Sequence, residues 1–368
     1  MEKDTMTYDS APTDDELDEF YADLRWADLY PLWTITDELL TPTPQPKAQP
    51  WLWSHKTLRE LADRALRLIP VERGGERRVL SLGNPGLAGT PYAAGTLWGA
   101  VQCLRPGELA PAHRHSPGAI RFVLEGDGVW TTVNGDACDM RAGDLVLTPS
   151  WNWHEHTGGA ESGMLWFDGL DLPIVQALDA IFFEPYPELR QPAPEIHNVS
   201  LTTYGDRERF VTGAVTDALH PGHSPLLIYP WTDTDARLGA IAAQSDEPMV
   251  SLEYVNPLNG ASVLPTLSCA MHRIRPAAHT HPVRRTGNTI FVVFAGSGSS
   301  VVDGIRYDWS AGDIFVVPSW SAAEHRSDEG ADLFALSDTP VLRALGLHRE
   351  QHLDEPQPVT GTFTPRGA

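Results

Sequence analysis

Three histidines in the first half of the chain have the spacing of a metal site. His113 and His115 are two residues apart, and His154 follows roughly 40 residues later, beyond a run of glycine-rich turn signals. Residues i and i+2 of a β-strand lie on one face because side chains alternate across the pleat. His154 can reach the same point from a neighbouring strand. Three imidazoles that converge inside a barrel would hold a metal ion with open coordination positions, so the pattern predicts a metal-dependent enzyme.

The elements that would position these histidines are strands. From about residue 70 onward, short apolar runs alternate with glycine, proline, asparagine and aspartate, which is typical of β structure. The preceding part differs: residues 14–29 and 55–69 have helical spacing, and Ser54 is a plausible N-cap for the second helix. The proline-rich residues 41–50 cannot continue a helix and form a connector.

An internal repeat organises the β region. Ala142–Trp151 returns as Ala311–Trp320, and the glycine pair of residues 126–128 returns at 296–298. We expect a helical tail after each copy, over residues 167–178 and 334–345. The predicted organisation has five parts: an N-terminal tail and helical arm (1–69), a first module with the metal site (70–183), a connecting region (184–265), a second module without metal ligands (266–349) and a C-terminal tail (350–368).

Comparison of the two copies separates candidate chemistry from scaffold. The three histidines align with Val283, Arg285 and Ala323, so only the first module keeps the ligand set. Three further first-module residues have no equivalent in the second copy: Arg121, Asp168 and Trp98 align with Phe291, Ala335 and Ser268. His156, in contrast, aligns with His325, which weakens a purely catalytic interpretation. His279 and His281 fall four residues before the ligand positions, and we expect them to bind no metal.

Composition excludes several classes of function. The formal net charge of −22 argues against a nucleic-acid-binding protein, because phosphate backbones require a basic surface. No apolar run approaches the ~20 residues of a membrane helix, and the N-terminus has no signal-peptide pattern. Three unpaired cysteines indicate free thiols in a reducing cytoplasm. We expect His197, His220 and His223 to be loop or surface histidines rather than ligands.

These motifs carry a family resemblance. Pro111-x-His113-x-His115, the glycine pair at 126–128 and Gly143-Asp144 followed by His154 resemble the two metal-binding motifs of cupins, and the doubled module resembles bicupins. Residues 73–78 (Arg-Gly-Gly-Glu-Arg-Arg) and 166–173 (Trp-Phe-Asp-Gly-Leu-Asp-Leu-Pro) make the chain similar to the gentisate 1,2-dioxygenase family, which includes salicylate and 1-hydroxy-2-naphthoate dioxygenases. The resemblance covers about residues 20–345. It implies an all-β bicupin of two jelly-roll barrels with an N-terminal helical segment, Fe(II) and a homotetramer.

Roles follow for the remaining site residues. Arg121 shares a strand face with His115, and an arginine inside a barrel is costly unless it meets an anion, so we expect it to pair with a substrate carboxylate. Asp168 would orient an imidazole or accept a phenol proton. Trp98 and Ala100 would shape the ring pocket. The resemblance alone adds His156, Arg77 and Gln102 as substrate contacts. The glutamate usual in the first cupin motif would fall at about Ala119 or Ile120, which agrees with a three-histidine site.

The activity that the resemblance implies is extradiol-type cleavage of a small hydroxylated aromatic acid by O2. We favour gentisate as the substrate, because its second hydroxyl group donates electrons into the ring. Cleavage between its carboxyl- and hydroxyl-bearing carbons would give maleylpyruvate. Three alternatives stay open: a salicylate or 1-hydroxy-2-naphthoate dioxygenase, a metallo-cupin isomerase or decarboxylase using manganese or zinc, and a bicupin that only binds a small carboxylate. Oxygen uptake with a panel of hydroxybenzoates discriminates among them.

Overall fold

The computed structural model describes residues 13–70, 78–159, 163–205 and 222–366, in two units that divide at Gln45 and Pro46. The first unit contains α1 (Asp14–Trp26), a 3-10 helix (Leu32–Thr34) and α2 (Thr36–Leu39). The Thr13 hydroxyl accepts a hydrogen bond from the Glu16 N–H while the Glu16 carboxylate accepts one from the Thr13 N–H, so a capping box starts α1. The predicted helix is confirmed, but it ends before Leu29 because Asp28 adopts a left-handed φ of 54°.

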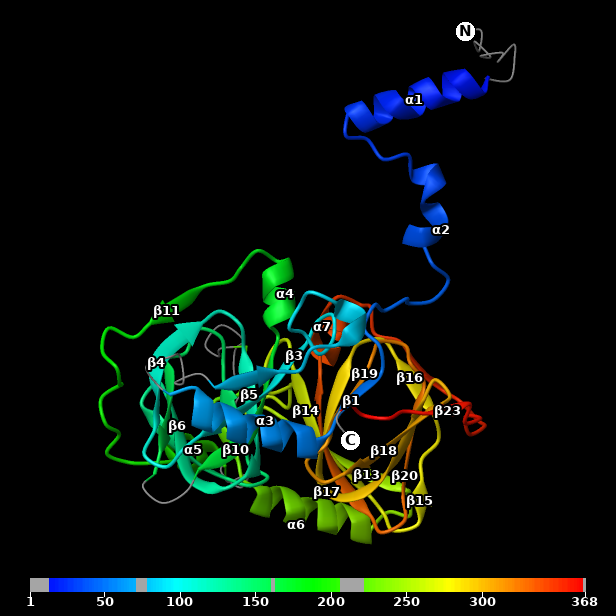
Figure 1. Ribbon diagram of the computed structural model, residues 1–368. Coiled ribbons are helices and arrows are strands. Elements are labelled where there is room, and N and C mark those ends of the chain that lie inside the picture. The colour runs from blue at the N-terminus through cyan, green and yellow to red at the C-terminus, as the bar shows by residue number, and fades with distance from the viewer. Residues whose placement is uncertain (1–12, 71–77, 160–162, 206–221, 367–368) are drawn as a thin grey trace. The chain divides into compact units, whose positions relative to one another are not determined.

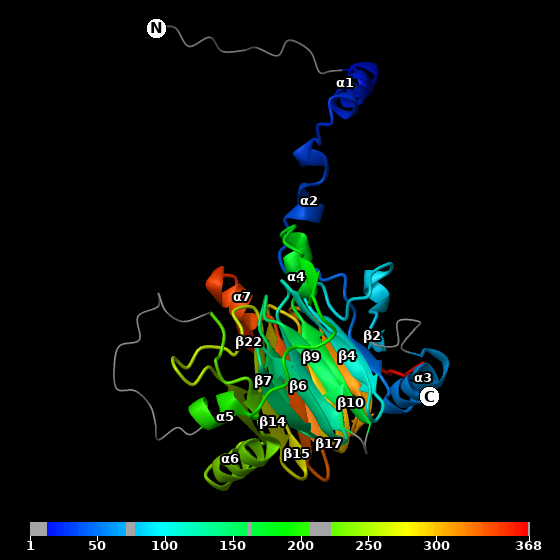
Figure 2. The ribbon, with the colours of Figure 1, turned by 90° about the vertical axis from the view of Figure 1, so that its left-hand side faces the viewer.

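The second unit contains two β-barrels, which confirms the predicted bicupin fold (Figure 1). The first barrel consists of a six-stranded sheet, β12-β8-β5-β10-β3-β2, and a five-stranded sheet, β11-β4-β9-β6-β7, whose strands lie side by side in Figure 2. Its strands are β2 (Val79–Ser81), β3 (Trp98–Leu104), β4 (Leu109–His115), β5 (Ala119–Glu125), β6 (Asp127–Val133), β7 (Asp136–Arg141), β8 (Leu145–Thr148), β9 (His154–Gly158), β10 (Met164–Leu170), β11 (Phe183–Pro185) and β12 (Ile228–Tyr229).

The second barrel repeats this plan with one continuous strand, β17, where the first barrel has β5 and β6. The first half of β17 pairs with β19 and β21, and its second half pairs with β18 and β20, so β17 runs through both halves of a single twelve-stranded sheet. The strands of this barrel are β1 (Trp51–Trp53), β13 (Met249–Tyr254), β14 (Ser268–Ile274), β15 (Ala278–His279), β16 (Val283–Arg285), β17 (Thr289–Val302), β18 (Ile305–Ser310), β19 (Ile314–Val317), β20 (Ala323–Ser327), β21 (Ala331–Ser337), β22 (Glu350–His352) and β23 (Gly361–Thr362).

Each barrel receives a strand from the segment that leads into the other barrel. β1 precedes the first module but pairs with β19 of the second, whereas β12 precedes the second module but pairs with β8 of the first. A helix follows each of these strands: α3 (His55–Leu68) after β1 and α6 (Trp231–Ala243) after β12. The predicted helix at 55–69 is confirmed, and Ser54 caps it by accepting a hydrogen bond from the Thr57 N–H. The exchange therefore joins the modules through their backbones.

The repeated Gly-Asp motif explains where these two helices begin. Gly143 and Gly312 occupy left-handed turns, with φ of 87° and 89°. The aspartate that follows each glycine accepts a hydrogen bond from the first N–H group of one of these helices. Asp144 accepts from Trp231 of α6 at 2.8 Å, and Asp313 accepts from His55 of α3 at 2.7 Å. A carboxylate satisfies the unpaired N–H groups of a helix start and is favoured by its positive end. The motif is therefore a scaffold device in both copies.

The expected helical tails are wrong in their first halves. Residues 167–170 and 334–337 complete strands β10 and β21, and helices begin only afterwards, as α4 (Leu172–Ala177) and α7 (Thr339–Ala344). Both strands are buried almost throughout, and a short run that is apolar on both faces cannot be distinguished from a buried helix by periodicity. A further short helix, α5 (Val199–Tyr204), lies in the connecting region.

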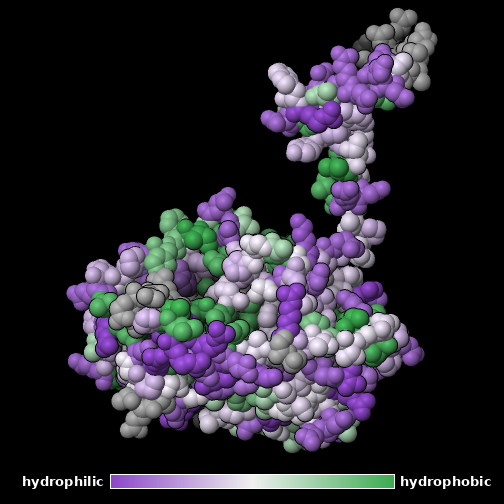
Figure 3. Space-filling view, in the orientation of Figure 1, coloured by the Kyte–Doolittle hydropathy of each residue, from purple (hydrophilic) through white to green (hydrophobic). Residues whose placement is uncertain are grey.

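Apolar clusters lie within each barrel and between the two. One apolar cluster lies inside the first barrel and one inside the second, and the largest cluster joins the two modules, with Phe122 stacked on Phe334 at 4.2 Å. Hydrophilic side chains cover much of the face visible in Figure 3, with hydrophobic ones in scattered groups. Among the described residues, the helices are all too short or too polar to cross a lipid bilayer.

Candidate metal centre

The three predicted histidines converge. Each of His113, His115 and His154 offers one ring nitrogen to a common point, and these three nitrogens lie within 4.8 Å of one another. His113 and His115 come from β4 and His154 from β9, and the two strands are paired with His113 directly opposite His154. No other group of three or more histidine, cysteine or acidic side chains in the described part of the chain has this arrangement.

A backbone hydrogen bond sets the orientation of each imidazole. The Nδ1 atoms of His113 and His115 lie 2.8 Å from the carbonyl oxygens of Pro111 and Pro117, and Nδ1 of His154 lies 3.0 Å from that of Asn152. A carbonyl oxygen can only accept, so in each ring the proton resides on Nδ1. The Nε2 lone pair then points away from the backbone, which is the state in which imidazole binds a metal.

The burial of His154 gives an independent test of the site. Its Nε2 atom is buried and has no hydrogen-bond partner, which is rare for a polar atom unless an ion or ligand belongs there. Burial, aided by the neighbouring imidazoles and Arg121, holds the pKa of His154 well below its usual range. The ring is therefore neutral at physiological pH. Three imidazoles that each offer a ring nitrogen to one point fit a divalent transition metal, consistent with a cupin metal centre.

A β-bulge in β4 places His113 directly opposite His154 of β9. Ala110 pairs with His156 and His113 pairs with His154, so β4 has one more residue than β9 over this stretch. Such a bulge turns the strand locally and re-aims the side chains that follow it. Phe183 of β11 covers the outer side of the site, with its ring stacked at 5.3 Å from that of His113. The sequence spacing alone contains no signal for the bulge.

His156 lies next to the triad but is held differently. It is buried, and its ring centre lies 6.2 Å from that of His154. Its Nδ1 atom is hydrogen-bonded to the hydroxyl of Thr131 at 2.8 Å. Burial holds the pKa of His156 well below its usual range, so the ring is neutral. Thr131 is a positioning residue, because it is paired directly with His156 between β6 and β9. Only this strand register identifies it; the sequence motif does not.

A buried ion pair lies on the opposite sheet. Arg121 of β5 and Asp168 of β10 are directly paired, and Arg121 Nε lies 3.3 Å from Asp168 Oδ1 without hydrogen-bonding to it. Arg121 also donates to Thr148, and the Trp166 indole N–H donates to Asp168 at 3.1 Å. Burial lowers the pKa of Arg121 and raises that of Asp168 to about 6, with the partner charge opposing each shift. Arg121 therefore keeps a buried donor for another anion.

The predicted pocket walls line the same face of this sheet. Ala100 is paired with Asp168, Trp98 with Leu170 and Gln102 with Trp166. Paired residues share a face, and Trp166 belongs to the apolar cluster inside the first barrel. Ala100 and Gln102 are buried, and Trp98 is half-buried. Arg77 lies outside the described residues.

The other candidate groups within the described residues form no second centre. His197 is exposed and paired with Asp139, and His223 is half-buried against the Ser224 carbonyl, so both have the local roles expected; His220 lies outside the described residues. His279 is exposed, 3.7 Å from Glu324. The three cysteines are free and buried, as predicted.

Comparisons with known proteins agree with this geometry. The "Cupin domain" family model matches residues 100–168. A gentisate 1,2-dioxygenase from a Streptomyces species is 44% identical over 351 residues, covering 90% of this chain and 94% of that protein. A 5-aminosalicylate 1,2-dioxygenase from a Comamonas species is 37% identical over 366 residues, covering 96% of each. The crystal structure of a salicylate 1,2-dioxygenase from Pseudoaminobacter salicylatoxidans, with gentisate adducts, superposes with a TM-score of 0.86 at 37% identity, covering 96% of this chain and 99% of that one.

Proposed function

This chain belongs to the gentisate and salicylate 1,2-dioxygenase family of bicupin ring-cleaving dioxygenases, and we propose that its substrate is gentisate and its metal Fe(II). The product would be maleylpyruvate, formed when both atoms of O2 enter between the carboxyl- and hydroxyl-bearing ring carbons. One observation carries the proposal: three convergent imidazoles share a barrel interior with a buried arginine whose Nε atom has no hydrogen-bond partner.

The charge of the ligand set supports iron and a chelating substrate. Three neutral imidazoles leave the full 2+ charge of a divalent ion, whereas a carboxylate in the set would cancel one unit. A substrate that brings a carboxylate and a phenolate can neutralise such a site. When bound, Fe(II) would supply the redox chemistry that allows O2 to react with an aromatic ring. The buried Nε2 of His154 and its two partners would hold it.

The other polar residues would orient the substrate. Arg121 would pair with the substrate carboxylate, because its Nε atom lacks a hydrogen-bond partner and the barrel gives it no solvent. When no substrate is bound, the Asp168 carboxylate balances the positive charge of Arg121. Its pKa of about 6 allows it to take up a phenol proton. His156, fixed by Thr131, would hydrogen-bond a substrate oxygen through its free Nε2 side. These contacts fix a near-attack arrangement without moving the backbone.

The choice of gentisate rests on ring electronics and pocket shape. The hydroxyl group para to the first one donates electrons into the ring, which favours attack by O2. Ala100, fully buried beside Asp168, leaves more room at the ring than a larger side chain would. The amino group of 5-aminosalicylate has the same electronic effect at the same position, and salicylate has neither group. The rate should therefore be lowest with salicylate, and we expect it to be highest with gentisate because the relative of 44% identity is a gentisate 1,2-dioxygenase.

Oxygen consumption tests this proposal directly. Purified protein loaded anaerobically with Fe(II) is mixed with each of the three acids, and O2 uptake is recorded with the near-ultraviolet spectrum of the product. Stoichiometric uptake, fastest with gentisate, is expected. Uptake that is fastest with salicylate would contradict the substrate assignment. Equal uptake after manganese or zinc loading would contradict the iron assignment.

We also propose that the protein is a homotetramer in the cytoplasm and that its modules follow the boundaries given above, with the metal only in the module of residues 70–183. Strands from outside those boundaries complete both barrels: β12 in the first, and β1, β13, β22 and β23 in the second. The mass of the particle in solution, measured by light scattering, tests the tetramer. A mass of about four times 40.4 kDa is expected. A monomer at micromolar concentration would contradict it.

A further inference from the structure

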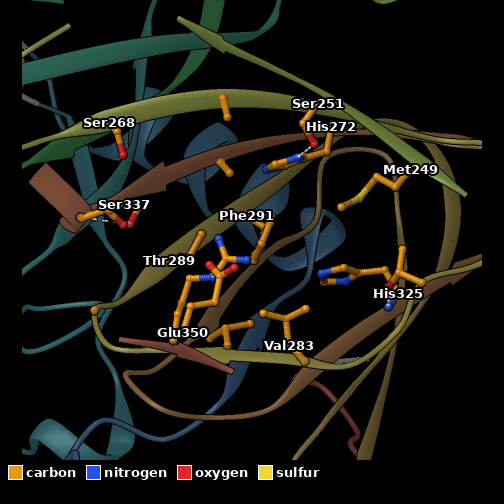
Figure 4. A pocket seen from close by; sticks show the side chains of 18 of the residues that line it. Met249, Ser251, Ser268, His272, Val283, Thr289, Phe291, His325, Ser337 and Glu350 are labelled. Carbon is orange, nitrogen blue, oxygen red and sulfur yellow. Dashed lines mark hydrogen bonds and ion pairs between the residues drawn. The ribbon is translucent and has the colours of Figure 1, made fainter. Parts of the chain in front are cut away.

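A cavity lies inside the second barrel, in the module that has lost the metal ligands. Its volume is about 620 Å³, within the usual range of ~300–1,000 Å³ for small-molecule sites. Strands β13, β14, β16, β17, β20, β21 and β22 contribute its walls. Figure 4 shows His272 and Ser251 across the cavity from Val283 and Glu350, with Phe291 between them. Nothing in the proposed activity uses this space.

The cavity is the space that the missing ligands would fill. Val283 and Ala323, the residues aligned with His113 and His154, are directly paired and line it. The structure therefore confirms the alignment of the two copies at these positions. Replacement of two imidazoles by small aliphatic side chains leaves room for a ligand. Ala335, in the position of Asp168, enlarges it further and removes an anion.

The second module has a positive charge at one of the three ligand positions. Arg285 takes the position of His115 in the alignment and lines the cavity, so the second barrel has a permanent cation in place of one of the three imidazoles. Its only ion pair in the described residues is with Glu350, at 3.5 Å, and both side chains are partly exposed. Such a pair contributes at most ~1 kcal/mol, so a ligand carboxylate that makes bidentate hydrogen bonds can replace Glu350 as the partner.

Two imidazoles offer further hydrogen bonds. The Ser300 hydroxyl accepts from the Trp309 indole at 2.9 Å and lies 2.7 Å from Nδ1 of His325. Because the indole can only donate, the serine proton is free to point at His325, which places the histidine proton on Nε2. His272 is also hydrogen-bonded to a serine, with Nδ1 2.7 Å from the Ser251 hydroxyl. Burial keeps both rings neutral, with pKa values lowered to about 3 and about 4.

We propose that the second module binds a small organic carboxylate of about the size of benzoate, without a metal. Arg285 anchors the carboxylate, His325 and His272 supply neutral hydrogen bonds, and Phe291 packs against the apolar body. The site is distinct from the metal centre, because each is enclosed by its own barrel. Its occupancy does not depend on which hydroxybenzoate the first module cleaves.

Fluorine NMR with 4-fluorobenzoate tests the proposal on the full-length, metal-loaded protein under anaerobic conditions. This probe has no ortho hydroxyl group, so it cannot form the chelate that a carboxylate and a neighbouring phenolate make together. Arg121→Ala removes the anchor in the first module and serves as the background. In that background one bound resonance should persist. Its complete absence would overturn the proposal.

Two substitutions at the cavity should act in opposite directions. Arg285→Gln should weaken the remaining binding at least about tenfold, because the charge-assisted hydrogen bonds are lost. Glu350→Gln should tighten it about threefold, because the internal competitor for Arg285 is removed. A misfolded variant cannot bind more tightly, so the second result stands without a folding control. Unchanged affinity in Arg285→Gln, or weaker binding in Glu350→Gln, would overturn the assignment.

Discussion

The carbonyl oxygens that accept from the ligand histidines belong to residues two positions away in the chain. Pro111 and Asn152 precede His113 and His154, and Pro117 follows His115. Each anchor is local, so it forms as soon as the strand forms and needs no distant partner. The sequence predicted the three ligands because strand alternation and the motif spacing carry that information. It could not supply the tautomers, which depend on the backbone turn at each histidine.

Arg121 gives a prediction at the same scale. Arg121→Gln should keep the bound metal but raise the KM for gentisate roughly 100-fold, because a buried charged partner of the substrate carboxylate is lost. Steady-state oxygen uptake and metal analysis measure both. Arg141→Gln removes an exposed arginine from β7 of the same barrel and should leave the KM unchanged. An Arg121→Gln enzyme with the wild-type KM would contradict the carboxylate role.

Asp144 predicts a pH dependence of stability. Burial raises its pKa to about 6, although the N–H groups of Trp231 and Arg141 donate to it. A carboxyl group that binds its proton more tightly in the folded chain stabilises the fold as the pH falls, and loses that contribution as the pH rises through the folded pKa. For a pKa raised from about 4 to about 6, the effect is at most about 3 kcal/mol.

The test compares melting temperatures of the wild type and Asp144→Asn between pH 7 and pH 5. The asparagine does not titrate, so the wild type should gain stability relative to the variant as the pH falls. Every other titrating group, the metal ligands included, is common to both proteins and cancels in the difference. Parallel pH profiles would show that Asp144 titrates as an ordinary carboxyl.

The elements of the two modules share several structural devices, which therefore belong to the scaffold. Arg114 stacks on Trp151 at 4.3 Å, and Arg284 stacks on Trp320 at 5.1 Å, in the equivalent place of the other barrel. Glu155 accepts from the Gln191 N–H, and Glu324 accepts from the Gln357 N–H. His156 and His325 are each hydrogen-bonded through Nδ1 to a hydroxyl group on the neighbouring strand, that of Thr131 and that of Ser300 respectively. These side-chain contacts occur in both modules, whereas the three metal-binding histidines occur only in the first.

The Gly-Asp turns yield a prediction for an element. Gly143 and Gly135 both have a φ of 87°, so alanine at either position should cost about 1 kcal/mol for its left-handed backbone. A Cβ at Gly143 would also lie 2.7 Å from Trp231 and Phe294, whereas one at Gly135 meets nothing within 4 Å. Gly143→Ala should therefore lose about 2–4 kcal/mol of stability and Gly135→Ala only about 1. Equal losses in chemical denaturation would contradict the packing of α6 on this turn.

Some helices and strands were predictable from the sequence and others were not. The helix at residues 55–68 was predictable because Leu58 and Ala62 lie on one buried face and Ser54 caps it. Helix α6 was missed, although it begins in the same way after β12, because its apolar residues do not form a clear stripe and its Asp144 cap is distant in sequence. The strand exchange was missed for the same reason: β1 and β19 are far apart in the chain, and local periodicity does not specify a partner.

Over the whole molecule, two carboxylates tie the modules together reciprocally. Asp171, at the start of α4, accepts from the Thr266 hydroxyl ahead of β14, and Asp338, at the start of α7, accepts from the Thr96 hydroxyl ahead of β3. Each also accepts a backbone N–H at 2.8 Å, from Gly118 and Asn288 respectively. Burial raises the pKa of both carboxyl groups. With the exchanged strands and the shared core, these contacts make the two modules one cooperative unit.

That unity predicts how the protein unfolds. Thr266→Val leaves Asp171 with one donor fewer and should cost about 1–3 kcal/mol, and Thr96→Val should do the same to Asp338. Calorimetry of the full chain should show one transition, shifted downward by each substitution and by roughly the sum in the double variant. A transition that splits in two on either substitution would show that the modules unfold independently.

The most direct test of the account is the iron content of the Fe(II)-reconstituted protein, counted per chain and measured beside gentisate-dependent oxygen uptake. The wild type should hold one ion per chain, and His113→Ala should hold none and consume no oxygen, because two imidazoles cannot retain the metal. His279→Ala, which removes an exposed histidine of the second module, should match the wild type in both. Iron and turnover retained in His113→Ala would contradict the assignment of the metal to the first module.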